Sequence, residues 1–499
     1  MSLYVIVLVA IVVSLLAVSL ARVGRVKTKA DYLVAGRSLP AFVLIFTLLS
    51  SWIGSGSLLA GAEAAYRHGF AALWLAAGGW FGLLFIYFIA PRARRFAQFT
   101  IPDLLEARYS QTTRVLGVIA ILFAYTGITS YQLIGGGDIL HLVFPAAITP
   151  VLGKYIMAAF VIAFTAVAGM SSVAYMDLVI GLLATITMCA ALPFLVHSAG
   201  GWSGVTHTLP ATHFQVLGDF TFVGAMELML PTLLLMLGNQ AMYQKFFSAK
   251  SERDARVAVV GWIIGTIILE TVIVAIAVVG SALFRHGEIT QHPREIIAYT
   301  AMHGLPAFLG ALLMGAVFAK IMSTANNFLF SPATNLINDV YVRYISPNAS
   351  DKRILLVSRL TVVLLGIWAL YQTMAITNVL QQTLYAYTVY SAALTPVILA
   401  AFYSKRANAA GAVTAIGLGT FITVLWNIAF PDGKVSHWIV RAGVSPHLAA
   451  QLAQHDAIFP ALVVAVLGLV IVSALTAPPS AEKLAPFHGA AASAQTAAD

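Results

Sequence analysis

The sequence predicts an all-α protein that crosses a lipid bilayer many times. Of its 499 residues, 60% are hydrophobic and only 9% are charged, whereas a soluble domain carries about 25% charged residues. Apolar runs of about 20 residues recur along the chain, and each is long enough to cross a hydrocarbon core of about 30 Å. The runs are continuous, without the alternation of polar and apolar residues that a transmembrane β-barrel requires, which excludes that class.

The apolar runs predict about thirteen spans, whose bounds are accurate to ~2–4 residues. The first run has no basic stretch before it and no small-residue cleavage site after it, so we expect a retained span rather than a signal peptide. The predicted spans cover residues 3–22, 39–66, 70–91, 114–144, 151–169, 173–198, 218–240, 257–283, 307–338, 354–377, 378–403, 410–430 and 457–477.

The basic residues predict the orientation of the chain in the membrane. Lys and Arg concentrate in every second loop, namely residues 21–29, 91–114, 243–256, 341–353 and 404–410. Such loops stay on the cytoplasmic side. We therefore expect a multi-pass plasma-membrane protein, in a bacterium the inner membrane, with its N-terminus outside and its C-terminus in the cytoplasm. The tail, residues 478–499, is rich in Ala and Pro and is expected to be disordered.

Two of the predicted spans contain helix-breaking residues near mid-membrane. One carries LLSSWIGSGSLLAG and the other LPTLLLMLGNQAMYQ, so we expect non-helical backbone near residues 50–57 and 231–240. Interrupted helices in corresponding positions of two halves point to a transporter's binding site, because the freed carbonyl groups need a partner. The alternative is that Ser and Gly only allow close packing between helices.

The span at residues 307–338 carries a polar stripe. Helical spacing places Lys320, Ser323, Thr324 and Asn327 on one face, and such a face must contact protein or water rather than lipid. Hydroxyl and carbonyl oxygens suit an alkali cation better than Zn or Fe. Alternatively, the hydroxyl groups bond only to carbonyls of their own helix.

Six segments of the chain resemble the solute:sodium symporter family. They are DYLVAGRSLP, TIPDLLEARYS, AGMSSVAYMDLVIGLL, NQAMYQKFFSAKSERDAR, AKIMSTANNFLFSPATNLINDVY and SKRANAAGA, in that order between residues 31 and 412. The resemblance implies the ten-helix fold of the bacterial leucine transporter, in which two inverted five-helix repeats have broken first and sixth core helices.

The resemblance also implies a division of the chain. Residues 39–198 would form the first repeat and residues 218–403 the second, joined by an extracellular loop at residues 199–217. Residues 1–38 would add an N-terminal span with a cytoplasmic linker, residues 404–477 two further spans, and residues 478–499 the tail.

Cation sites follow from the resemblance, residue by residue. The family's sodium site would here use the carbonyls of Ser50, Ile53 and Lys320 and the hydroxyls of Ser323 and Thr324. A second cation or proton site, found in some members, would use Asp177, Asn326 and Asn327.

Lys320 departs from the family, which usually has a small residue at that position. Its carbonyl would bind Na⁺ while the side chain reaches the cytoplasm, or its ammonium would replace the cation, or it would face a crevice with no role in transport. A buried ammonium needs a counter-charge, and we expect Asp177 to supply it, directly or through Asn327 or a water.

The resemblance implies a secondary transporter rather than an enzyme. It would import a small polar organic solute by alternating access, coupled to a Na⁺ gradient; alternatively, it would be Na⁺-independent or proton-coupled, with Lys320 in place of the cation. The solute would bind near Trp52, Ser57, Gln132, Asn239 and Gln240. Glu270, in mid-span, is either a proton site or a packing acid. We expect the lipid bilayer but no nucleic acid as a partner, and a functional monomer.

Overall fold

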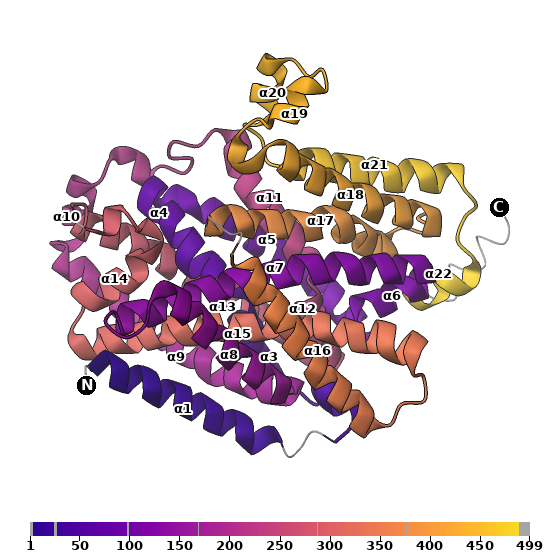
Figure 1. The fold of residues 1–499 in the computed structure, drawn as a ribbon, viewed down its shortest axis with the longest axis horizontal. Helices are drawn as coiled ribbons and strands as arrows, with labels where there is room; N and C mark the ends of the chain where they lie inside the picture. The colour runs from indigo at the N-terminus through magenta and orange to yellow at the C-terminus, as the bar shows by residue number, and fades with distance from the viewer. Residues whose placement is uncertain are drawn as a thin grey trace.

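A computed structural model describes residues 3–23, 27–96, 99–167, 169–286, 288–374 and 378–488. These residues form helices, most of which run along the horizontal direction of Figure 1. Eleven of the described helices are long and apolar enough to cross a membrane, and Leu3–Ser19 and Ala41–Trp52 are shorter apolar helices. The predicted all-α polytopic fold class is therefore confirmed.

The helices of the first half follow the predicted spans. They are α1 (Leu3–Val23), α2 (Lys29–Val34), η1 (Ala35–Arg37), α3 (Ala41–Trp52), η2 (Gly56–Gly61), α4 (Ala62–His68), η3 (Gly69–Ala72), α5 (Leu73–Phe96), α6 (Ile101–Arg108), α7 (Gln111–Val143), α8 (Pro150–Val167), α9 (Met170–Ser198), α10 (Gly201–Thr208) and η4 (Ala211–Phe214).

The second half continues in the same way. Its helices are α11 (Phe222–Gly238), α12 (Gln240–Ser248), α13 (Glu252–Leu283), η5 (Glu288–Thr290), η6 (Pro293–Glu295), α14 (Ile296–His303), α15 (Ala307–Asn335), η7 (Leu336–Ile345), α16 (Asp351–Gln372), α17 (Val379–Tyr403), α18 (Ala409–Ala429), η8 (Pro431–Gly433), α19 (His437–Arg441), α20 (Pro446–Leu452), α21 (Ile458–Leu475) and α22 (Ala481–His488).

The helix bundle has two distinct ends in Figure 1, the α10 end on the left and the α22 end on the right. All five basic loops meet at the α22 end. The Lys29 amide donates to Asp351, Arg94 to the Ala249 carbonyl, Arg343 to Glu106 and Arg108 to the Ser404 carbonyl. These contacts join the loops into one layer at this end of the bundle, and the side of the membrane that the layer faces stays a prediction.

The C-terminal tail is partly ordered, which corrects the expectation of disorder from residue 478. Residues Ala481–His488 form α22. Leu484 is buried, and the Lys483 ammonium donates to the Glu106 carbonyl at 2.8 Å. An apolar residue and a cation on one short helix thus anchor it to α6. The remaining predicted tail, residues 489–499, lies outside the described residues.

Both predicted helix breaks are present, but they are shorter than expected. α3 ends at Trp52, Ile53 has extended backbone (φ −83°, ψ 104°), and the helix resumes as η2 at Gly56. In the second break only Asn239 (φ −60°, ψ 111°) separates α11 from α12. Pro231 lies inside α11 and does not end it. Proline is tolerated in membrane helices because neighbouring groups can satisfy the carbonyl that it leaves without a partner, and α17 packs closely here, where Ser391 donates to the Pro231 carbonyl at 3.0 Å.

Candidate cation and solute sites

The polar face of α15 points into the protein. Lys320, Ser323, Thr324 and Asn327 are all buried, beside the break between α3 and η2. These four side chains lie on one face of α15 because they are spaced three or four residues apart along the helix. The face therefore meets protein groups rather than lipid, as the sequence predicted.

Thr324 lies at the centre of a group of oxygen atoms. Its hydroxyl oxygen is 3.0 Å from the Ser50 carbonyl, 3.1 Å from the Ile53 carbonyl and 3.0 Å from the Lys320 carbonyl. The Ser323 hydroxyl lies 3.4 Å from the same Ser50 carbonyl. We call these five oxygens the carbonyl cluster. A hydroxyl has a single proton to donate, so Thr324 alone cannot satisfy three carbonyls at once, whereas a cation bound among them can contact all of them.

Gly54 makes this close approach possible. A Cβ atom at Gly54 would lie 2.7 Å from the Thr324 Cβ and 2.8 Å from the Gln132 side-chain oxygen. Any larger residue would therefore push the α3 break away from α15. The glycine in the sequence IGSGS thus serves the geometry of the carbonyl cluster and not only the flexibility of the break.

Asp177 forms a second group of contacts on the other side of Ser323. Its carboxylate accepts hydrogen bonds from Thr47 (2.6 Å), Ser323 and Asn327 (3.2 Å). The ammonium of Lys245 lies 3.7 Å from the carboxylate, and both side chains are 0% exposed. We call Asp177, Thr47, Asn327 and Lys245 the carboxylate cluster. Asp177 and Asn327 therefore meet as predicted.

Asn326 does not join the carboxylate cluster. It accepts a hydrogen bond from Thr165 of α8 at 3.0 Å, because adjacent residues on a helix point about 100° apart. The predicted grouping of Asn326 with Asp177 is thus not the arrangement that the structure has.

Lys245 was not predicted as a site residue. The sequence places it among the charges of residues 243–256, which we assigned to a cytoplasmic loop. In the structure it lies on α12, completely buried, and its ammonium also donates to the Thr47 carbonyl at 2.9 Å. The run of apolar residues that follows it, Phe246 and Phe247, was the available signal, since both are fully buried.

Lys320 contacts the α3 break rather than Asp177. Its ammonium donates to the Leu49 carbonyl at 3.2 Å and to the Ser50 hydroxyl at 3.4 Å. The expected direct pairing with Asp177 is not found, because the ammonium within ion-pairing distance of that carboxylate is that of Lys245; a pairing of Lys320 through a water stays a prediction. The side chain is also fully buried, so it does not extend to cytoplasmic water.

A small inner cavity lies beside the α3 break. Its volume of about 20 Å³ is enough for one water molecule. Trp52, Ser57, Glu270 and Tyr387 line it together with residues of α5 and α11. The rings of Trp52 and Tyr387 stack with their centroids 6.3 Å apart, and Ser57 donates to the Glu270 carboxylate at 2.8 Å.

The other residues predicted to bind solute have other contacts. The Gln132 side-chain oxygen accepts from the Ser55 amide at 2.7 Å. That of Asn239 accepts from the Tyr125 hydroxyl at 2.9 Å and caps α12, and that of Gln240 accepts from the Ile101 amide. None of the three is among the residues that line the inner cavity, and their role in solute binding stays a prediction.

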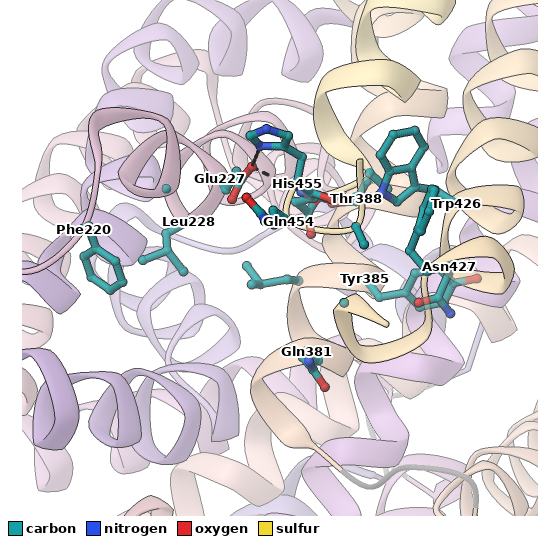
Figure 2. A pocket seen from close by; sticks show the side chains of 17 residues that line it. Phe220, Glu227, Leu228, Gln381, Tyr385, Thr388, Trp426, Asn427, Gln454 and His455 are labelled. Atoms are coloured by element: carbon teal, nitrogen blue, oxygen red, sulfur yellow. Dashed lines mark hydrogen bonds and ion pairs between the residues drawn. The ribbon is translucent and has the colours of Figure 1, made fainter. Parts of the chain in front are cut away.

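A larger cavity, which we call the vestibule, opens toward the α10 end between the starts of α11 and α17 and the segment that carries α19 and α20. Its volume is about 360 Å³. Figure 2 shows Glu227 and His455 pointing toward each other on one side and Tyr385, Thr388 and Trp426 on the other. The carboxylate of Glu227 lies 2.9 Å from the His455 ring. Burial raises the pKa of Asp456, also in the lining, to about 6.

The vestibule and the inner cavity use the same two helices. On α11, Leu228 lines the vestibule and Thr232, one turn further, lines the inner cavity. On α17, Tyr385 and Thr388 face the vestibule while Thr383 and Tyr387 face the inner cavity. The packing of α11 against α17 therefore separates the two spaces.

Comparison with known proteins matches residues 32–419 to the Sodium:solute symporter family. The osmoregulated proline transporter OpuE of Bacillus subtilis (strain 168) is 26% identical over 415 residues, 79% of this chain and 83% of that protein. The sodium/pantothenate symporter of Escherichia coli (strain K12) is 28% identical over 409 residues, 78% and 82% of the two chains. The structure of a Na⁺-coupled sialic acid symporter in a substrate-bound outward-open state superimposes with a TM-score of 0.75 at 18% identity, covering 96% of this chain and 98% of that one. This likeness establishes the transporter fold.

Proposed function

Because the chain belongs to the sodium:solute symporter family, and is thus a transporter rather than an enzyme, we propose that it imports a small polar organic solute together with Na⁺ by alternating access. The observation that carries this proposal is the carbonyl cluster, in which one hydroxyl lies 3.0–3.1 Å from three carbonyl oxygens at once. Na⁺ here is a transported substrate.

The chemistry of the carbonyl cluster fits Na⁺. Its ligands are neutral oxygens, which suit a hard monovalent cation and give no thiolate or imidazole for a transition metal. The described residues also contain no group of three or more His, Cys, Asp or Glu side chains arranged to hold a metal ion. The cation would bridge the α3 break and α15, so it binds best when the two elements are close together.

The α3 break links the cation to the solute. Its carbonyls at Ser50 and Ile53 belong to the carbonyl cluster, and its side chains at Trp52 and Ser57 line the inner cavity. A cation that fixes the break also fixes the cavity wall. Each ligand would then raise the affinity for the other by the same factor, which is the requirement for coupled transport.

The carboxylate cluster supports transport of a single Na⁺ at a time. In relatives that use a second cation site, Asp177 would be a ligand, but here its carboxylate is paired with the Lys245 ammonium. A buried carboxylate that already has a counter-charge gains little from Na⁺ and would have to release Lys245 first. We propose that Lys245 fills this position permanently.

Lys320 favours one further candidate, a Na⁺-independent or proton-coupled symporter. Its ammonium already donates to the Leu49 carbonyl and the Ser50 hydroxyl, on the same break that supplies the carbonyl cluster. A lysine can lose its proton in a buried site, whereas an arginine stays charged. Protonation of Lys320 would then replace Na⁺ binding as the event that fixes the α3 break.

The orientation proposed for import places the α22 end in the cytoplasm. The joined layer of basic loops at that end supports this choice. The vestibule, at the α10 end, would then face the outside and receive the solute.

Uptake into proteoliposomes tests the proposal. The full-length protein is reconstituted, and accumulation of labelled amino acids, amines, sugars and carboxylic acids is measured under an imposed Na⁺ gradient, an imposed proton gradient, or neither. We expect accumulation with the Na⁺ gradient only. Accumulation driven by protons alone would establish the second candidate, and equilibration without any gradient dependence would overturn both.

A further inference from the structure

Glu270 is a buried carboxylate for which the cation clusters provide no partner. It lies on α13, is 4% exposed, lines the inner cavity and accepts a hydrogen bond from Ser57. Among the described residues, no Lys, Arg or His lies within ion-pairing distance of it. Lys320 attracts it only from further away, and its ammonium donates to the α3 break instead.

The contrast with Asp177 defines what Glu270 lacks. Asp177 is equally buried but receives three side-chain hydrogen bonds and pairs with Lys245. A buried carboxylate without a counter-charge is costly. Because Glu270 lines a cavity, a ligand that enters the cavity can supply the positive charge that the protein does not.

Two aromatic rings flank the same cavity. Trp52 and Tyr387 stack at an interplanar angle of 26°, and both are lining residues together with Glu270. Aromatic faces attract ammonium and guanidinium groups, and Trp does so most strongly. A carboxylate next to two aromatic rings is an arrangement that recognises an organic cation.

The vestibule, through which a solute would approach the inner cavity, is lined by acidic residues, so it carries the same negative charge as Glu270. Glu227 and Asp456 line the vestibule. Among the described residues that line it there is no Lys or Arg, and the one basic residue, His455, is paired with Glu227. Above pH ~6 the carboxyl group of Asp456 is mainly ionised. A cleft lined by one sign of charge concentrates ligands of the opposite sign.

We propose that the transported solute carries a positively charged nitrogen, as a protonated amine or a quaternary ammonium group, and that the Glu270 carboxylate binds it between Trp52 and Tyr387. This inference rests on the proposed function, because it requires the solute to enter the inner cavity. That cavity has room for only one water molecule in this structure, so α11 and α17 must separate to admit the solute. A solute with a carboxylate and no cationic group would be repelled.

Matched pairs of probes test the charge requirement directly. Choline is compared with its uncharged isostere 3,3-dimethyl-1-butanol, and L-proline with tetrahydrofuran-2-carboxylate, in which oxygen replaces the amine. A wider set of amines and guanidines extends the search. Binding is measured as the rise in melting temperature of the purified full-length protein, and transport as uptake into proteoliposomes.

We expect wild-type protein to bind the member with the positively charged nitrogen, in at least one pair, about tenfold or more tightly than its partner. Glu270→Gln should remove that preference, and Glu270→Asp should restore part of it. Glu63→Gln is the matched control, because Glu63 pairs with Arg67 on α4 and is not a lining residue of the cavity. The melting temperature without ligand identifies any variant that merely fails to fold.

The outcomes separate this inference from the proposed function. Na⁺-driven uptake of a solute without a cationic group, at a rate unchanged by Glu270→Gln, would overturn the inference and leave the function intact. Charge-selective binding that Glu270→Gln removes, without gradient-driven uptake, would support the inference and overturn the function. If no cationic probe binds or is transported, the inference is wrong.

Discussion

Two polar clusters meet at Ser323 on α15, yet they differ in charge. The carbonyl cluster contains only neutral oxygens, which come from Ser50, Ile53, Lys320, Ser323 and Thr324. The carboxylate cluster contains a full negative charge on Asp177 and the chain's own ammonium from Lys245. The difference teaches that a site for a mobile cation needs oxygen ligands that do not already have a positively charged partner within the protein.

The same reasoning explains why the two clusters would respond differently to Na⁺. A tethered ammonium is always present at high effective concentration, so Na⁺ competes poorly for Asp177. The carbonyl cluster has only hydroxyl protons to displace, and each is a weaker partner than a cation. Substitutions in the carboxylate cluster should therefore affect folding stability, whereas substitutions in the carbonyl cluster should affect the dependence of uptake on Na⁺.

Lys245→Met should have the largest effect, on stability. It leaves Asp177 buried without a counter-charge, which costs about 3–5 kcal/mol. We expect a clear fall in the melting temperature of the detergent-purified protein. Adding Asp177→Asn should recover most of the loss, because the pair is then removed as a unit.

The choice of salt sharpens this prediction. If the freed Asp177 carboxylate can bind Na⁺, excess NaCl should stabilise Lys245→Met more than KCl does, and should stabilise wild type less. Equal melting temperatures for wild type and Lys245→Met would mean that the ammonium contributes nothing, and the contrast between the clusters would fail.

Thr324→Ala should have the next largest effect, on ion dependence. It removes the oxygen that contacts three carbonyls, worth about 2 kcal/mol, or about a 30-fold rise in the Na⁺ concentration for half-maximal uptake. Thr423→Ala is the matched control, because Thr423 is also buried and its hydroxyl donates to the carbonyl one turn earlier, on α18. Similar shifts in the two variants would place the cation elsewhere.

Much of this arrangement could be predicted from the sequence. Helical spacing predicts that Lys320, Ser323 and Thr324 share a face, and the Gly- and Ser-rich segment predicts a break opposite it. The meeting of Thr324 with Ser50 and Ile53 came from the family resemblance, whose motifs carry these positions. The local sequence pattern and the positions of the family's motifs were together sufficient to predict the carbonyl cluster.

The partner of Asp177 could not be predicted in the same way. Lys320 lies inside a predicted span and Lys245 just beyond the end of another, and only the packing of α12 against α3 brings the Lys245 ammonium to the carboxylate. Charge counting assigned Lys245 to a loop because its neighbours in sequence include several exposed charges. Likewise, at the single-residue break at Asn239 the Tyr390 hydroxyl of α17 donates to the Gly238 carbonyl and accepts from the Gln240 amide, contacts that no local pattern specifies.

Lys320→Met should have a smaller effect, and in the opposite direction from Thr324→Ala. It removes a positive charge next to the carbonyl cluster, so the Na⁺ concentration for half-maximal uptake should fall by up to about tenfold as repulsion between like charges is lost. The measurement is the Na⁺ dependence of solute uptake in proteoliposomes. Uptake that is Na⁺-independent in wild type and becomes Na⁺-dependent in the variant would instead establish the second candidate function.

Ser323→Ala should have the smallest effect, and it tests whether the clusters are separate. Ser323 donates to Asp177 and also lies 3.4 Å from the Ser50 carbonyl, so its loss should raise the half-saturating Na⁺ concentration only about threefold. Ser358→Ala is the control, because Ser358 is also buried but its hydroxyl donates only to a carbonyl of its own helix.

Double-mutant cycles then test the separation of the clusters. The change that Ser323→Ala makes in the half-saturating Na⁺ concentration should couple with that of Thr324→Ala, and the change it makes in stability should couple with that of Lys245→Met. If the Na⁺ dependence and the stability each couple with both Thr324→Ala and Lys245→Met, the two clusters act as one site, because independent sites give additive changes.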